Sequence, residues 1–126
     1  MIKGLGTDIV EIRRIKRLIS KYDKHFKEKI YTLSEMDYCE TKAAPEIHFA
    51  GRWAVKEAFY KALPVSCQEH SHWKSIEVVP LDEKGKPVIR ICSDTLVKIL
   101  EKEHISKYHL SISHERNYCI ASVVLE

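Results

Sequence analysis

The spacing of apolar side chains along this chain changes from two residues to between three and four near residue 12. Residues 2–10 alternate in the manner of a β-strand, and the even-numbered positions Gly4, Gly6, Asp8 and Val10 share one face. Apolar residues then recur at helical spacing, at Ile12, Ile15, Leu18, Ile19, Tyr22 and Phe26. We therefore predict a strand followed by an amphipathic helix whose opposite face is basic.

Two further helices are predicted before the middle of the chain. Ser34 followed by Asp37 resembles a capping box and predicts a short helix that ends near residue 40. Pro45 lies in a stretch that reads as a break. The run over residues 49–63 is apolar on most of its circumference, so we predict a long, largely buried helix that ends at Pro64.

The second half of the chain favours strands. Residues 65–74 are polar and irregular, and Ser93 can cap a helix that ends near residue 104. Strand patterns cover residues 75–81, 87–92, 108–113 and 118–125. The predicted fold is α+β, a mainly antiparallel sheet packed with helices in the order β-α-α-α-β-β-α-β-β. The last strand is apolar on both faces, which predicts a central strand or one covered by a neighbouring subunit.

Composition narrows the class of protein. With 126 residues, 44% of them hydrophobic, we expect one domain over residues 1–126 with its own core. No run of about twenty apolar residues exists, and the start of the chain lacks a secretory signal pattern, which favours a cytoplasmic protein without a membrane anchor. The four cysteines form no C-x-x-C pair, so four reduced thiols are favoured over disulfides.

The net charge of +3 is unevenly distributed. Basic residues crowd one segment, at Arg13, Arg14, Lys16, Arg17, Lys21, Lys24, Lys27 and Lys29, against only Asp23 and Glu28. This patch indicates an acidic partner or a phosphate-rich ligand, with a plain solvated helix face as the alternative. A nucleic-acid-binding protein would also explain it, but no aromatic side chains are interleaved as single-strand binders require.

Two acids in apolar surroundings are the strongest chemical signal. Asp8 lies in the glycine-rich strand, and Glu57 lies in the long apolar helix with Lys61 one turn further on. Glu57 and Lys61 could form an ordinary surface ion pair, worth only a few tenths of a kcal/mol. Alternatively, two carboxylates without clustered His or Cys suit Mg²⁺, with Lys61 and Arg52 neutralising substrate phosphates. This set favours chemistry at a phosphoanhydride.

Other candidates carry less weight. Ser113 and His114 could suggest a nucleophile and a base, but adjacent strand residues point in opposite directions, which argues against a hydrolase triad. A phosphate-binding role for His114 at the strand end is favoured instead. Lys84 and Lys86 flank Gly85 in a tight turn that suits either an anion or a plain hairpin.

Several motifs together resemble one family. They are Gly4-Leu5-Gly6-Thr7-Asp8-Ile9, the run from Phe49 through Arg52-Trp53-Ala54-Val55-Lys56-Glu57-Ala58 to Lys61-Ala62, Gly85-Lys86-Pro87, and His109-Leu110-Ser111-Ile112-Ser113-His114. Their order and spacing are similar to those of the holo-acyl-carrier-protein synthase family, the short branch of the 4'-phosphopantetheinyl transferases. The resemblance runs from end to end of the chain.

The resemblance implies the fold of that superfamily and a Mg²⁺-dependent reaction. Phosphopantetheine would pass from coenzyme A to a serine of apo acyl carrier protein, releasing adenosine 3',5'-bisphosphate in support of fatty acid biosynthesis. It further implies a homotrimer with an active site at each subunit interface. The expected partners are coenzyme A and the acyl carrier protein, with neither nucleic acid nor membrane.

The resemblance also implies residue roles. Asp8 and Glu57 would bind the metal and act in catalysis with Lys61, which would contact the coenzyme A phosphates. The coenzyme A site would further include Arg52, Lys86, Pro87, Ser113 and His114. The carrier protein would dock on Arg13, Arg14, Arg17 and Lys21. The proton of the carrier serine would pass to a metal-bound water or to Glu57.

One segment departs from the family pattern. Pro64-Val65-Ser66-Cys67 stands where the family usually continues into a Gly-Thr-Gly-Ile loop. Glycine allows the backbone to approach a phosphate closely, whereas proline also removes an N–H donor. We therefore expect this loop to take a different path or to use Ser66. A chain that binds coenzyme A but has lost the transferase activity is the corresponding alternative.

Overall fold

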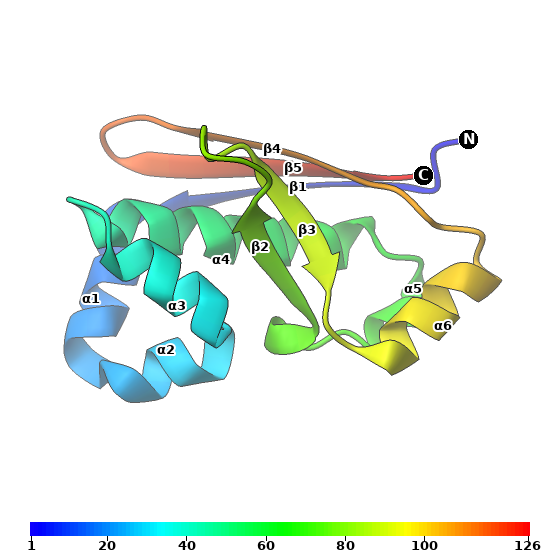
Figure 1. Ribbon diagram of the computed structural model, residues 1–126, viewed down its shortest axis with the longest axis horizontal. Helices are drawn as coiled ribbons and strands as arrows, with labels where there is room; N and C mark the ends of the chain where they lie inside the picture. Colours follow the sequence, from blue (N-terminus) through cyan, green and yellow to red (C-terminus); the bar gives the residue numbers. More distant parts are fainter.

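The computed structural model describes all 126 residues, and it has an α+β architecture. In Figure 1 a three-stranded sheet lies against the long helix α4, with short helices gathered at both ends of that helix. The strands are β1 (Gly4–Glu11), β2 (Ile76–Pro80), β3 (Pro87–Ile91), β4 (Tyr108–His114) and β5 (Tyr118–Leu125). The helices are α1 (Ile12–Tyr22), α2 (Lys24–Ile30), α3 (Leu33–Glu40), α4 (Pro45–Ala62), α5 (Val65–Gln68), the 3₁₀ helix η1 (Trp73–Ser75) and α6 (Asp94–Lys102).

All strand pairs are antiparallel, as predicted, but they form two sheets and not one. The larger sheet has the order β1-β5-β4, and β2 and β3 form a separate hairpin. The prediction of a central last strand is confirmed, because β5 lies between β1 and β4. None of the helices combines the length and the hydropathy that crossing a lipid bilayer requires.

Two glycines allow β1 to lie directly on α4. A Cβ atom built on Gly6 would lie 1.8 Å from the carbonyl oxygen of Ala58, and one on Gly4 equally close to that of Ala62. No side chain fits in that space, so the backbones of the strand and the helix are in direct contact. The glycines before Asp8 therefore make room for the backbone of α4.

The core forms around α4, which is buried along most of its length. Ala54, Val55, Ala58 and Phe59 are all fully buried between the larger sheet and the other helices. The prediction of a long, mostly buried helix is confirmed, although the helix begins at Pro45 and not near residue 49. Pro45 starts the helix because a first-turn residue needs no N–H partner there.

The helix before α4 is capped two residues earlier than predicted. Thr32, not Ser34, caps α3: its side chain accepts a hydrogen bond from the Glu35 N–H, and the Glu35 carboxylate accepts one from the Thr32 N–H. The acid at the third position is therefore Glu35 and not Asp37. The longer glutamate reaches back to the backbone N–H, which completes both halves of the capping box.

Two other local predictions need correction. The basic amphipathic helix is divided at Asp23, whose positive φ of 42° interrupts it. Asp23 is the last cap residue of α1 and the first cap residue of α2. The stretch predicted to be irregular contains α5 and η1. By contrast, Ser93 caps α6 as predicted, since its hydroxyl accepts a hydrogen bond from the Leu96 N–H at 3.2 Å.

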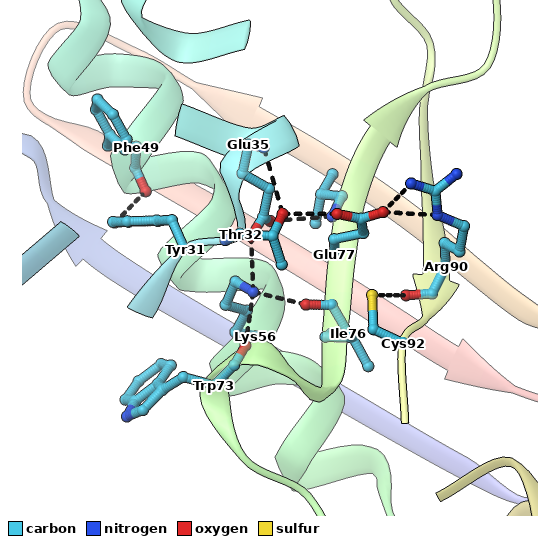
Figure 2. Close-up of polar contacts among 11 residues, drawn as sticks. Tyr31, Thr32, Glu35, Phe49, Lys56, Trp73, Ile76, Glu77, Arg90 and Cys92 are labelled. Atoms are coloured by element: carbon cyan, nitrogen blue, oxygen red, sulfur yellow. Dashed lines mark hydrogen bonds and ion pairs between the residues drawn. The ribbon is translucent and has the colours of Figure 1, made fainter. Parts of the chain in front are cut away.

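A buried polar network joins the β2–β3 hairpin to α3 and α4 (Figure 2). Lys56 Nζ lies 2.9 Å from Glu35 Oε1, and these side chains are only 2% and 0% exposed. The same ammonium group donates hydrogen bonds to the carbonyl oxygens of Trp73 and Ile76. Burial lowers the pKa of Lys56, and the Glu35 carboxylate opposes that shift.

The network continues into the hairpin. Thr32 Oγ1 donates a 2.6 Å hydrogen bond to Glu77, and Arg90 forms an ion pair with the same carboxylate. Burial alone would raise the pKa of Glu77, but the hydrogen bonds from Thr32 and Arg90 hold it below its usual value. With every charge partnered, the network fixes the hairpin against α3 and α4.

Replacing Gly6 by alanine should disrupt the contact between β1 and α4. The added Cβ would meet a helix backbone that cannot move aside, so we expect a loss of at least about 3 kcal/mol in the free energy of unfolding, measured in urea. Gly51→Ala is the matched control, because its Cβ would lie 3.5 Å from Ile112 Cγ2 in ordinary contact. Alanine in a helix interior should be neutral or slightly stabilising there. Equal stability of the Gly6→Ala variant and the parent would contradict the direct backbone contact.

Candidate active site

Asp8, Glu57 and Lys61 meet where β1 crosses α4. Asp8 lies on the face of β1 that is turned toward the helix, and its Oδ1 is 3.0 Å from Lys61 Nζ. Lys61 Nζ also donates a 3.2 Å hydrogen bond to the carbonyl oxygen of Thr7. Lys61 therefore pairs with Asp8 on the neighbouring strand, so the interpretation as a simple pair of Glu57 and Lys61 along the helix is wrong.

Glu57 lies close to a second acidic side chain, Asp8. Burial raises its pKa, the negative charge of Asp8 raises it further, and Lys61 and Arg14 oppose both effects. Burial is the largest of these effects, so the pKa of Glu57 is raised despite the two nearby cations.

This donor set suits a hard divalent cation. The structure contains no group of three or more His, Cys, Asp or Glu side chains that could hold a metal. Two neighbouring carboxylates match Mg²⁺, which keeps several waters and takes its other ligands from substrate phosphates. The residues present therefore fit Mg²⁺ shared between Asp8 and Glu57.

A second, basic cluster lies on another part of α4 and surrounds the ring of Tyr38. The guanidinium of Arg52 lies 4.3 Å from the ring centroid, and Lys42 Nζ lies 4.5 Å from it. His48 packs edge-on against the same ring. Burial lowers the pKa of His48, and the positive charges of Arg52, Lys42 and His114 lower it further. We call these residues, with Tyr38, the basic cluster.

Arg52 has one hydrogen-bond donor that no group of the chain accepts. Only 5% of the residue is exposed, yet its Nε is buried without a hydrogen-bond partner. A buried donor without an acceptor is costly unless a ligand supplies one. Together with the Lys42 ammonium group beside Tyr38, this donor makes the basic cluster a candidate anion site.

The β2–β3 turn borders the basic cluster. Gly85 takes a positive φ of 76°, and a Cβ built there would lie 3.5 Å from the hydroxyl oxygen of Tyr38. Lys86 and Pro87 follow directly, and Pro87 begins β3. The structure therefore brings Lys86 and Pro87 toward the same region as Arg52 and His114.

We call Asp8, Glu57 and Lys61 the acidic group. The acidic group and the basic cluster lie at opposite edges of the larger sheet. Asp8 is on β1 and His114 is on β4, and β5 separates the two strands. Their backbones are thus about 10 Å apart across the sheet, and α4 lies over the face between them. Ser113 lies on the other face of β4, away from His114. One chain therefore does not gather all of the predicted site residues around one point.

The basic face of α1 forms a groove. Arg13, Arg17 and Lys21 line a groove of about 640 Å³ together with Lys16 and Ser20. Arg14 points elsewhere: its guanidinium lies 5.6 Å from the Trp53 ring centroid, and its charge reaches Glu57. Arg14 therefore connects the basic face of α1 with the candidate metal site.

Sequence reasoning missed Tyr38, Lys42 and His48. His48 and Arg52 are four residues apart on α4, a spacing that places them on one helix face and was the available signal. Lys42 and Tyr38 precede the helix and gave no comparable pattern. The segment after Pro64 forms α5, where the Ser66 hydroxyl contacts Glu103 at 3.5 Å, toward α6.

Comparisons with known proteins identify the family of the chain. The family model described as the 4'-phosphopantetheinyl transferase superfamily matches residues 4–123. The chain belongs to this superfamily. A curated holo-[acyl-carrier-protein] synthase from Halothermothrix orenii is 44% identical, over 100% of this chain and 98% of its own length. The chain is accordingly an enzyme of the phosphopantetheinyl transferase class.

Solved structures of the family share the whole fold. The holo-[acyl-carrier-protein] synthase from Neisseria meningitidis has a TM-score of 0.85 and 35% identity, covering 100% of this chain and 99% of that one. The synthase from Bacillus anthracis, solved in complex with coenzyme A (3',5'-ADP), has a TM-score of 0.78 and 32% identity, covering 99% and 96%. The predicted α+β phosphopantetheinyl transferase fold is thereby confirmed.

The raised pKa of Glu57 predicts a pH-dependent cost in stability. An acid whose folded pKa exceeds its unfolded value binds more protons in the folded state, so stability falls as pH rises through that interval. Without divalent cations, Glu57→Gln should be more stable than the parent at neutral pH. The difference should vanish below the pKa, where Glu57 is protonated. Urea unfolding at both pH values checks this, and equal stability at neutral pH would contradict it.

Proposed function

We propose that this chain transfers the 4'-phosphopantetheine group of coenzyme A to a serine of apo acyl carrier protein. The proposal rests above all on the convergence of Asp8, Glu57 and Lys61, where two acids lie together and a lysine beside them can contact a phosphate. Adenosine 3',5'-bisphosphate is released. The modified carrier then serves fatty acid biosynthesis.

Asp8 and Glu57 would hold Mg²⁺ between their carboxylates. When bound, this ion would supply the positive charge that both the acid pair and the coenzyme A pyrophosphate lack. Lys61 is anchored on Asp8 and Thr7, so its ammonium group is held beside the same position. It stabilises the negative charge that develops on the departing phosphate.

The bond changes follow from this placement. The carrier serine Oγ forms a bond to the phosphorus that bears the pantetheine arm, and the bond from that phosphorus to the bridging pyrophosphate oxygen breaks. The bridging oxygen leaves with adenosine 3',5'-bisphosphate. The serine proton passes to the Glu57 carboxylate or to water.

The basic cluster would bind the nucleotide end of coenzyme A. Arg52 offers a buried donor without a partner, Lys42 adds positive charge beside Tyr38, and the rings of His48 and His114 add hydrogen-bonding groups. This suits the 3'-phosphate, which a planar guanidinium recognises well. Lys86 and Pro87, at the adjoining turn, would border the adenine.

A homotrimer would join the acidic group of one copy to the basic cluster of the next. The two groups lie at opposite sheet edges, so each chain offers half of two sites. The outer face of the larger sheet also exposes apolar side chains, including Leu5 at 67%, Ile9 at 62% and Ile120 at 40%. Ser113 lies on that same face. An apolar face of this kind fits coverage by a second copy.

The acyl carrier protein would dock on the basic face of α1. Arg13, Arg17 and Lys21 line the groove there, and an acidic partner would be steered to it by charge. Arg14 lies between this face and Glu57. A carrier bound on α1 would therefore present its serine to the acidic group.

Alanine at Asp8 or Glu57 should reduce transfer by about a hundredfold or more, because charge at the reacting phosphates is no longer balanced. The measurement is mass spectrometry of apo carrier protein after incubation with coenzyme A and Mg²⁺. Asp37→Ala, an exposed acid on α3, is the matched control and should react like the parent. Near-normal modification by either active-site variant would contradict the metal assignment. Bound coenzyme A without any transfer by the parent would contradict the function.

A further inference from the structure

The β2–β3 hairpin is attached to the rest of the chain near one end only. Three consecutive residues at the start of β2, Ile76, Glu77 and Val78, make all of its hydrogen bonds to α4, to α3 and to the N-terminal cap of α3. Residues 79–90 make hydrogen bonds only within the hairpin. Burial ends at the same level, because Val78 and its cross-strand partner Ile89 are the buried residues nearest to the turn. The position of the turn therefore depends on how the start of β2 is held.

Glu77 is the charged side chain at this attachment (Figure 2). Only 5% of the residue is exposed, and its carboxylate accepts a 2.6 Å hydrogen bond from Thr32 Oγ1. The same carboxylate pairs with Arg90, which lies opposite Glu77 on β3. One side chain thus joins both strands of the hairpin to the N-terminus of α3. Hydrogen bonds to a carboxylate are directional, so they set the orientation of the hairpin more sharply than apolar packing does.

Helix α3 connects this attachment with the basic cluster. Thr32 caps its N-terminus, and Tyr38 near its other end packs against the guanidinium of Arg52. The Tyr38 hydroxyl lies beside the turn of the hairpin, 3.5 Å from where a Cβ on Gly85 would stand. The hairpin and α3 therefore approach each other twice, first where Thr32 binds Glu77 and again where the turn meets Tyr38. The hydrogen-bonded approach determines the place of the other.

We propose that Glu77 and Thr32 are positioning residues for coenzyme A: their hydrogen bond holds the β2–β3 hairpin on α3, so that Lys86 and Pro87 stay at the border of the basic cluster. The inference rests on the proposed function, because it takes the basic cluster to bind the nucleotide end of coenzyme A. Neither positioning residue touches the substrate. Both act on the affinity for the nucleotide, and the acidic group at the opposite edge of the larger sheet is left unchanged.

Valine at Thr32 tests this inference, because it removes the hydroxyl that binds Glu77. Calorimetry should show adenosine 3',5'-bisphosphate bound at least about fivefold more weakly than by the parent, a change of about 1 kcal/mol. The KM for coenzyme A should rise by a similar factor, whereas kcat and the KM for the carrier protein should stay within about twofold. Thr32→Ser keeps the hydroxyl and should restore the affinity of the parent.

Two further variants separate the hairpin attachment from the capping of α3, which Thr32→Val also removes. Ser93→Ala is the matched control, because the Ser93 hydroxyl caps α6 in the same way and accepts its hydrogen bond from the Leu96 N–H. It should bind the nucleotide like the parent. Glu77→Met replaces the carboxylate by an apolar side chain of similar size and leaves the cap of α3 intact. It should weaken nucleotide binding as much as Thr32→Val.

The opposite results would overturn the inference. Parent-like binding by Glu77→Met, or equal weakening by Ser93→Ala and Thr32→Val, would show that the attachment does not set the affinity. A merely structural role would lower kcat through the folded fraction and leave both KM values unchanged, which would also contradict positioning. Failure of the proposed function would look different: the parent would modify no carrier protein, while calorimetry would still compare the variants.

Discussion

The direct contact between the backbones of β1 and α4 is the constraint on which the rest of the structure depends. Gly4 and Gly6 have no side chains, so the strand lies against the carbonyl oxygens of Ala62 and Ala58. That contact sets the distance between the two elements where Asp8 leaves the strand. It brings the Asp8 carboxylate within 3.0 Å of Lys61 and close enough to Glu57 to raise the pKa of that acid. A single methyl group at either glycine would separate the residues of the acidic group.

Helix α4 contributes residues to both the acidic group and the basic cluster, and it holds the two apart. It carries Glu57 and Lys61 toward β1, and it carries Arg52 toward the basic cluster near β4. The buried ion pair of Lys56 and Glu35 fixes this helix against α3 and the β2–β3 hairpin, so both groups are held on one rigid element. The two groups lie at opposite edges of the larger sheet, and this separation is the reason for proposing that two copies of the chain contribute to one site.

The sequence permits prediction where a pattern has few physical explanations. Asp8 and Glu57 stood out because carboxylates are costly in apolar segments, and the apolar run of β5 could only be a central or covered strand. Prediction failed where the outcome depended on a distant partner. Glu35 caps α3 from a fully buried position because Lys56 and the Val78 N–H meet its carboxylate, and no local pattern near residue 35 contains that information. Tyr38 and Lys42 likewise join Arg52 only through the tertiary fold.

The central claim is that one active site draws its acidic group and its basic cluster from different copies of the chain, and subunit mixing tests it most directly. Asp8→Ala chains retain the basic cluster, and Arg52→Met chains retain the acidic group. Each variant alone should be inactive in carrier modification. Co-expressed with different tags and purified through both, the mixed assembly should regain activity, because about one third of the interfaces in a mixed trimer would pair two intact halves. A mixed assembly no more active than either variant alone would contradict the claim.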